Sequence, residues 1–299
     1  MNKLFGLFLL ALAFLAPSAA QAVGCFWVGG TGSINDTTHW SNASGGSGST
    51  CGAAGGWPNS ASDDGTFNAS SGGGTITRNV NWTTRFLDVA AFTGTFGNAG
   101  DTATVTTLGF TNNGSGTRTV NLGASTWTIS TAGSWTQTGA TNLTFNANTS
   151  TIVFSGSTSA TNQVANFGTF TYNVVTFNAE SAQSNKGTTW NASATIPTLN
   201  IAAPNTFLMS NATNNSITTF NVTGGSLSAF VSFLSIAGGN QFTYTFAGAA
   251  ACSFCIFRDM IAATSAITAT NSITLGNNTN ISVTPPSAGG GGGGRIIGG

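Results

Sequence analysis

Residues 142–156 read NLTFNANTSTIVFSG, and this stretch contains the pattern that decides the fold. Apolar residues recur at every second position in both of its halves, with Thr, Ser or Asn between or beside them. A period of two indicates β-strands with one buried face. Similar runs follow from residue 75 onwards, at 75–82, 103–111, 126–130, 170–179, 216–225, 229–238 and 242–248. Helical periodicity is nearly absent, so we expect an all-β fold.

Landmark residues in these runs recur at similar distances along the chain. Leu122 and Leu143 are 21 residues apart, Phe177 and Ile201 are 24 apart, and Ile201 and Val222 are 21 apart. A repeat of about 20–25 residues is typical of one coil of a parallel β-solenoid, in which each coil adds a strand to each sheet. The spacing therefore predicts a parallel β-helix. A β-sandwich or jelly roll, which also contains many short strands, is the alternative.

The first 22 residues have the features of a secretory signal peptide. Lys3 supplies a positive charge, residues 4–15 are apolar, and Ala20-Gln21-Ala22 is a small-residue cleavage site. The apolar run is too short for a stable membrane anchor, and no other run is long and apolar enough to span a bilayer. We expect a chain that is exported, that starts at Val23 after cleavage, and that has no integral membrane segment. Secretion, display at the cell surface and association with a virion all fit this expectation.

Three further segments follow the signal peptide. Residues 23–74 are rich in Gly and Trp, lack the repeat, and are predicted to cap the β-helix, whose end strands need cover. Residues 75–284 form the predicted repeat domain. Residues 285–299 read PPSAGGGGGGRIIGG; two prolines end the last strand, and the glycine run cannot fold alone. We expect a flexible, disordered tail there.

Charged residues are scarce and balanced. Only 5% of the chain is Asp, Glu, Lys or Arg, against about 25% in a typical domain, and the net charge is zero. Nucleic-acid surfaces need clustered Lys and Arg, and so do surfaces for anionic membranes. The chain has no such cluster, so neither partner is expected. Its 22 Phe and 7 Trp supply material for a core.

The four cysteines fit an exported protein, in which disulfides persist. They allow three pairings, of which Cys25 with Cys51, closing the N-terminal segment, is preferred. Cys252 and Cys255 form a Cys-x-x-Cys in strand-like sequence, without the helix N-terminus that lowers a thiol pKa in redox motifs. We expect a local disulfide or two buried thiols there, rather than a zinc or redox site.

The single histidine, His39, lies three residues after Asp36. A hydrolase triad also needs a nucleophile held on an elbow, and no G-x-S-x-G elbow follows a strand and opens a helix in this chain. His39 is therefore predicted to pack in the N-terminal cap rather than to catalyse.

Asp63 and Asp64 are the one adjacent pair of carboxylates. On a strand they would point to opposite faces, whereas in a turn they could cap amides or bind calcium. The spaced D-x-D-x-D pattern of a calcium loop is absent. Calcium is therefore a weak candidate, and no other metal or cofactor is expected.

A secreted polysaccharide lyase or glycoside hydrolase is the alternative to a non-catalytic function. A glycosidase needs two carboxylates about 5–10 Å apart. In the repeats, Asp88, Asp101, Glu180 and Asp259 are spread over about 170 residues. Arg258-Asp259 is the best polar pair on a predicted strand. If the protein were an enzyme, its catalytic residues would be Arg258, Asp259 and Glu180.

Tryptophans are candidates for glycan binding because an aromatic ring packs well on the apolar face of a pyranose. Trp82, Trp127, Trp135 and Trp190 lie in the repeats and would serve if they were exposed. For any one of them the core is the more common place.

Thr-x-Thr pairs recur in the repeats, among them Thr104/Thr106 and Thr126/Thr128. On a flat solenoid face such pairs could bind ice. They have no fixed period in the sequence, which argues against an ordered array.

Two N-terminal motifs carry a family resemblance. FWVGGTGSINDTTHWS (26–41) and WPNSASDDGTFNASSG (57–72) resemble the opening of a family of exported or phage-encoded repeat proteins. These often open with W-x-GGTG…D-x-x-HWS, continue with P-x-S-x-DD-x-x-F, and then run into β-helical repeats, which residues 142–157 and 169–179 resemble. The resemblance implies a surface-exposed β-helix of adhesin or tail-fibre type, mostly without assigned chemistry.

These features favour a non-catalytic, surface-exposed β-helix protein that binds a cell-surface glycan or protein partner. It would be adhesin-like or part of a phage fibre or virion. A purely structural surface or virion component without a ligand is a further alternative. The sequence leaves the oligomeric state undecided. Fibre-like β-helices commonly trimerise, but no coiled-coil heptad in this chain supports a homo-oligomer.

Overall fold

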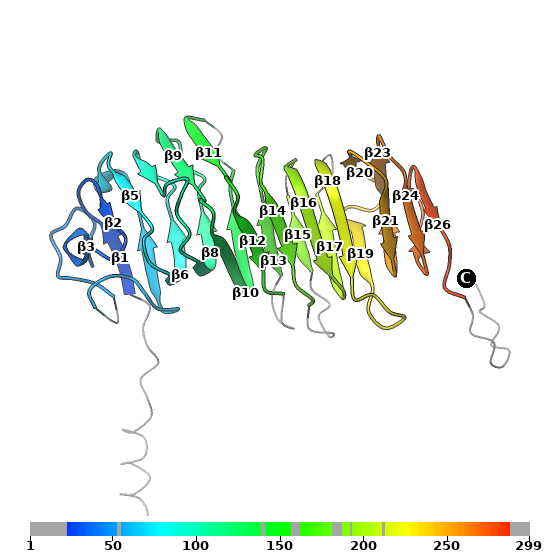
Figure 1. The fold of residues 1–299 in the computed structure, drawn as a ribbon, viewed down its shortest axis with the longest axis horizontal. Coiled ribbons are helices and arrows are strands. Elements are labelled where there is room, and N and C mark those ends of the chain that lie inside the picture. Colours follow the sequence, from blue (N-terminus) through cyan, green and yellow to red (C-terminus); the bar gives the residue numbers. More distant parts are fainter. Residues whose placement is uncertain are drawn as a thin grey trace, which may run out of the picture.

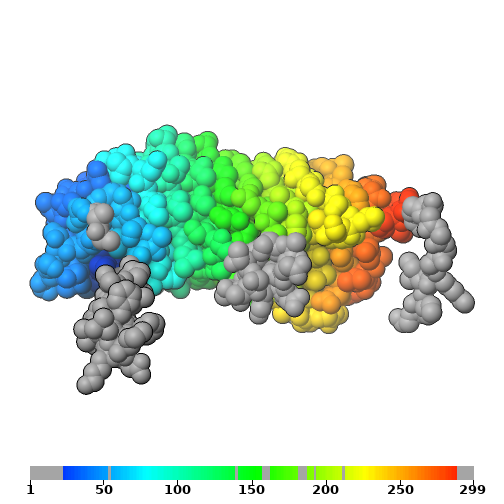
Figure 2. Space-filling view, turned by 90° about the horizontal axis from the view of Figure 1, so that it is seen from below, coloured from blue at the N-terminus to red at the C-terminus, as the bar shows by residue number. Residues whose placement is uncertain are grey.

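The computed structural model describes residues 23–52, 55–138, 141–156, 162–180, 187–191, 193–210 and 213–287. These residues form an elongated body in which strands stack side by side along one axis, from β1 at one end to β26 at the other (Figure 1). Figure 2 shows the same rod from a second direction. The predicted signal peptide and residues 288–299 of the predicted tail lie outside the described residues.

The described chain is almost entirely β-structure. Its helical elements are two short 3₁₀ turns, η1 (Thr37–His39) and η2 (Ala69–Ser71). Nowhere in the described ranges is there a helix with the length and hydropathy needed to cross a membrane.

The predicted parallel β-helix is confirmed, and the β-sandwich alternative is wrong. Among the described strands, every ladder is parallel except the pairing of β1 with β3. Phe177 pairs with Ile201, and Ile201 pairs with Val222, so the spacings of 24 and 21 residues are the lengths of successive coils. The spacing of Leu122 and Leu143 is not, because Leu143 pairs with Arg118.

Each coil contributes to three faces, which we call sheets A, B and C. Sheet A consists of the first halves of β6 (Trp82–Asp88), β8 (Val105–Thr111) and β10 (Thr126–Thr136), then β12 (Thr151–Phe154), β14 (Val174–Phe177), the second halves of β16 (Thr195–Ala202) and β18 (Asn214–Thr223), and finally β21 (Ala250–Ser253), β24 (Ile267–Thr270) and β26 (Ile281–Val283).

Sheet B starts at the N-terminal end of the rod. It consists of β1 (Val23–Trp27), β4 (Asp63–Thr66), the second halves of β6, β8 and β10, then β13 (Gln163–Asn166), β15 (Thr188–Trp190), β17 (Asn205–Met209), β19 (Val231–Ser235), β22 (Cys255–Arg258) and β25 (Ile273–Thr274).

Sheet C completes each coil. It consists of β2 (Gly32–Ser33), β5 (Thr75–Thr77), β7 (Thr95–Phe96), β9 (Arg118–Asn121), β11 (Leu143–Asn146), the first halves of β16 and β18, then β20 (Phe242–Phe246) and β23 (Met260–Ala263). The bridge between Thr171 and Thr195 continues this sheet between β11 and β16.

Inward-facing side chains stack along the axis because successive strands are parallel and in register. Phe154 lies on Phe177 with ring centroids 4.6 Å apart and an interplanar angle of 12°. Phe233 stacks on Phe207 at 5.4 Å and on Phe257 at 5.8 Å. Burying such a ring contributes about 1.5–3 kcal/mol, and an aromatic pair adds about 0.5–1.5 kcal/mol. These rows form one core that runs the length of the rod.

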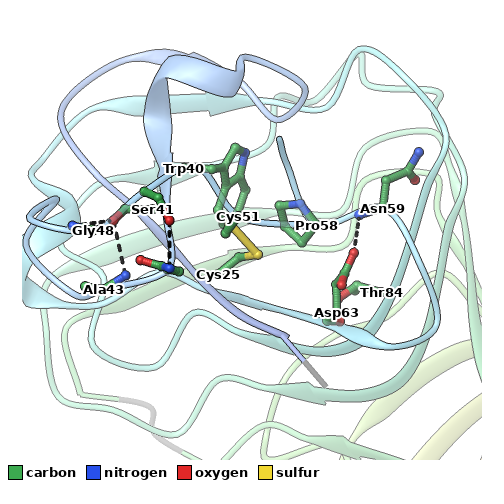
Figure 3. The surroundings of a disulfide bond; sticks show 12 residues. Cys25, Trp40, Ser41, Ala43, Gly48, Cys51, Pro58, Asn59, Asp63 and Thr84 are labelled. Atoms are coloured by element: carbon green, nitrogen blue, oxygen red, sulfur yellow. Dashed lines mark hydrogen bonds between the residues drawn. A yellow bond between two sulfur atoms is a disulfide. The ribbon is translucent and has the colours of Figure 1, made fainter. Parts of the chain in front are cut away.

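The N-terminal segment both extends the sheets and covers their end. β1 continues sheet B through its ladder with β4, and β2 continues sheet C through its ladder with β5. β3 (Trp40–Ser41) runs antiparallel to β1 along its outer edge. A disulfide joins Cys25 on β1 to Cys51, beside Trp40 (Figure 3). A second disulfide joins Cys252 on β21 to Cys255 on β22.

Phe177→Asp is expected to unfold the β-helix. Phe177 is only 1% exposed, and an unpaired carboxylate in its place would cost several kcal/mol out of a total stability of about 5–15 kcal/mol. Urea denaturation followed by circular dichroism measures the loss. Thr176→Ser, on the outer surface of the same strand, should change stability by less than about 0.5 kcal/mol. Equal stability of the two variants would contradict the inward placement of Phe177.

The two disulfides are expected to stabilise the fold unequally. Cys25 and Cys51 are separated by 26 residues and Cys252 and Cys255 by 3. Chain entropy assigns about 3.5 kcal/mol to the longer loop and about 2 kcal/mol to the shorter one. Replacing both cysteines of the first pair by serine should therefore lower the melting temperature more than replacing both cysteines of the second. The reverse order would show that chain entropy does not control this difference.

Candidate functional site

The tryptophans proposed for glycan binding are in the core, so that prediction is wrong. Trp82 is 1% exposed, and Trp127, Trp135 and Trp190 are fully buried. Each falls on an inward position of its strand, where the alternation of the sheet places it. None of the four has a ring face available to a sugar.

Their indole N–H groups also find partners inside the protein. Trp127 donates to the backbone oxygen of Leu122 over 3.1 Å, Trp190 donates to Asn215 Oδ1 over 3.2 Å, and Trp82 donates to the backbone oxygen of Pro58. Such internal hydrogen bonds allow an amphipathic ring to be buried whole.

His39 and Asp36 make structural contacts in the N-terminal segment. The imidazole stacks on Trp27 with ring centroids 4.5 Å apart, and its Nδ1 lies 2.9 Å from the backbone oxygen of Val28. Asp36 caps η1, accepting hydrogen bonds from the amide and hydroxyl of Thr38, and these bonds hold the pKa of Asp36 below its ordinary value. The two side chains thus fix the loop that covers the end of sheet B.

Asp63 and Asp64 lie on β4 and point to opposite sides of it. Asp63 is fully buried and accepts a hydrogen bond from the Asn59 amide over 3.2 Å (Figure 3). Asp64 faces outward and makes a two-pronged pair with Arg85, at 2.6 and 2.8 Å. The weak calcium candidates therefore do not share a site. In the parts of the chain that are described, no three metal-ligating side chains cluster elsewhere.

Arg258, Asp259 and Glu180 are held by structural contacts. Asp259 is 2% exposed and accepts hydrogen bonds from Asn277 Nδ2 over 2.7 Å and from the Gly239 amide over 3.2 Å. Arg258 Nε lies 3.5 Å from Asp259 Oδ2, and its Nη2 donates to the backbone oxygen of Ser235 over 2.8 Å. These bonds tie the corner after β22 to the neighbouring coils.

The structure does not bring Glu180 to Asp259. Glu180 is buried and accepts a hydrogen bond from the Thr206 amide, at the start of β17. Asp259 follows the end of β22, and β19 lies between β17 and β22 in sheet B. Glu180 precedes β15, which pairs with β17, so the two carboxylates belong to coils three steps apart and lie at opposite ends of the sheet B strands. They cannot act on one bond.

A buried ion pair is the charged feature that the sequence pattern missed. Arg78 is 1% exposed, and its guanidinium lies over Trp127 at 4.7 Å and donates to the backbone oxygen of Leu122 over 2.7 Å. Its Nε is 3.5 Å from Asp101 Oδ2. Burial lowers the pKa of Arg78 to about 10, a shift that the Asp101 carboxylate opposes, so Arg78 stays charged at neutral pH. The pair ties three successive coils together.

The best candidate for a ligand site is a groove on the outside of sheet A. β18 and β21 lie next to each other there but form no backbone ladder, so the sheet is interrupted between them. A groove of about 580 Å³ opens at this break. Its lining includes Asn178, Asn200, Asn221, the partly buried Phe220 and, on the far side, Ala251. No ionisable side chain lines it.

A ladder of side-chain amides runs along this groove. Asn221 Nδ2 donates to Asn200 Oδ1 over 2.9 Å, and Asn200 Nδ2 donates to Thr176 Oγ1 over 3.3 Å. Ala251, on β21, carries no amide that would continue the ladder, so within the described chain it ends at Asn221. An Asn side chain has donors and acceptors to spare, which suits a neutral hydroxyl-rich ligand.

Comparison of the chain with family models, curated proteins and solved structures finds no match.

The groove was not predicted from the sequence. Asn200 and Asn221 each follow an apolar residue in LNI and FNV, which is a visible signal, but the break after β18 has no counterpart in the local pattern.

Asp259→Asn is expected to lower the free energy of unfolding by about 1–2 kcal/mol, because charge-assisted hydrogen bonds inside the fold are lost. The backbone of Asp259 is left-handed, with φ of 59°, a conformation that Asn also tolerates, so the change isolates the charge. Asp64→Asn, in the more exposed pair with Arg85, should cost under about 1 kcal/mol. Urea titrations of both variants give the comparison, and equal small losses would contradict a structural role for Asp259.

Proposed function

We propose that this chain is a non-catalytic, surface-exposed β-helix protein that binds a neutral cell-surface glycan in the groove between β18 and β21. The observation that carries the proposal is the amide ladder that ends in this groove. Asn221 and Asn200 offer hydrogen bonds to sugar hydroxyls, and Phe220 offers an apolar contact. The absence of ionisable groups from the lining favours a neutral sugar over a uronic or sialic acid.

The placement of the acidic residues supports a non-catalytic role. Hydrolysis of a glycosidic bond needs two carboxyl groups facing one another across the bond. Glu180 and Asp259 are buried at separate corners, and each is engaged in hydrogen bonds of the fold. This placement argues against the lyase or hydrolase alternative at Glu180 and Asp259.

We also propose that the protein acts outside the cell that makes it, as an adhesin or as part of a phage fibre or virion. The signal-peptide features, the disulfides and the elongated shape support this setting. The groove lies on the side of this rod, three strands from the C-terminal end of sheet A.

The test mixes the purified full chain with intact cells and with extracted neutral polysaccharides. Bound protein is measured together with newly formed reducing or unsaturated ends. Asn221→Ala removes one amide from the groove and should weaken binding about 5–10-fold, the loss of a hydrogen bond or two. Asn146→Ala is the matched control, because Asn146 donates to Asn121 over 2.8 Å in a similar ladder on sheet C.

Binding without product release, sensitive to Asn221→Ala and insensitive to Asn146→Ala, supports the proposal. Release of products would overturn it and direct attention to Arg258, Asp259 and Glu180. Absence of both binding and release would also overturn it, leaving a purely structural component of a surface or virion.

A further inference from the structure

The outer face of sheet A carries two straight rows dominated by threonine. Backbone register aligns them from coil to coil, although their spacing in the sequence varies. The first row is Thr83, Thr106, Thr128, Val153 and Thr176, and the second is Thr104, Thr126, Thr151, Val174, Thr198 and Thr219. Thr104 belongs to the second row because the residue after it, Val105, pairs with Trp127. Neither row contains a charged residue.

The geometry of these rows is that of a two-dimensional lattice. Neighbouring coils lie about 4.8 Å apart, and alternate residues of one strand lie about 6.7 Å apart on the same face. Each threonine presents a methyl group beside a hydroxyl group, whereas Val153 and Val174 present methyl groups alone. β-branched side chains are stiff at χ1, so the lattice is preformed. Water oxygens in ice repeat on a similar scale in two perpendicular directions.

We infer that this threonine array on sheet A is an ice-binding surface. Its ligand is the face of an ice crystal, which the hydroxyl groups join by hydrogen bonds while the methyl groups hold ordered water between the rows. Adsorption over several coils arises from many weak contacts, so it needs no pocket and no charge.

Other ligands fit this part of the surface less well. A protein partner needs a centre of exposed aromatic or Arg side chains, and the rows have none. The groove described above shares Thr176 with the array, and the other threonines of the two rows lie outside its lining. The inference does not depend on the proposed glycan site.

Sheet C supplies a matched control for the array. It has one row of threonines, Thr75, Thr95, Thr119 and Thr144. The adjacent row contains Asn121 and Asn146, whose amides bond to each other, so the two-row lattice is absent. Thr119 and Thr128 are both half-buried outward positions with a neighbour on either side.

The experiment measures thermal hysteresis and inhibition of ice recrystallisation by the purified full chain. The wild type should lower the freezing point below the melting point and shape the ice crystals. Thr128→Lys and, separately, Thr106→Lys should lose most of this activity, while Thr119→Lys keeps it. Melting curves for all variants check that each is folded.

Lack of activity in the wild type would overturn the inference, and so would equal losses in Thr128→Lys and Thr119→Lys. Asn221→Ala should leave the ice activity unchanged, and Thr128→Lys should leave glycan binding unchanged. Failure of one proposal is therefore visible without failure of the other.

Discussion

The in-register, parallel hydrogen-bond ladder between successive coils is the constraint on which this structure depends. A parallel ladder places each residue directly beside its counterpart in the next coil. Phe154 therefore lies on Phe177, and Phe207, Phe233 and Phe257 form a stack of three rings. The same ladder lines up the outward side chains, so that amides and hydroxyls also form rows. The core and the surface are thus two consequences of one backbone arrangement.

The ladder also explains how the protein folds with so few charged residues. Backbone N–H and C=O groups are paired between coils, and neutral Thr, Ser and Asn side chains cover the outside. Stacked like charges would repel at the short distance between coils, so a row of lysines or carboxylates would be unfavourable. The buried charge of Arg78 is held against Asp101, Trp127 and backbone oxygens rather than stacked on a like charge. At the N-terminal end, β3 and the Cys25–Cys51 disulfide cover the edge that the ladder leaves open.

The two proposed binding surfaces lie on sheet A. One is at the break in its backbone ladder, and the other is where that ladder is regular. Between β18 and β21 the backbone pairing of sheet A lapses, and the amide ladder from Thr176 to Asn221 meets a groove. In the preceding coils the pairing is regular, and the threonine rows form a lattice. The four tryptophans of the repeats are instead inside the rod, and Glu180 and Asp259 are buried at its corners. The two proposals made here, a glycan groove and an ice-binding array, both rest on neutral side chains on the outside of sheet A.

The sequence by itself determined the fold class, the coil length near Phe177, Ile201 and Val222, and the near absence of charge, because alternation and composition are local properties. It also indicated that the core was the more common place for the tryptophans. Only the tertiary structure decided which residues share a row. Thr106 and Thr128 are 22 residues apart and Thr128 and Val153 are 25 apart, and yet Thr128 lies directly between the other two in one row of sheet A. The corners between the sheets absorb the difference, so the period is irregular along the chain and regular in space. For the same reason the pairing of Leu143 with Arg118, the separation of Glu180 from Asp259 and the groove after β18 were decided by the folding of whole coils.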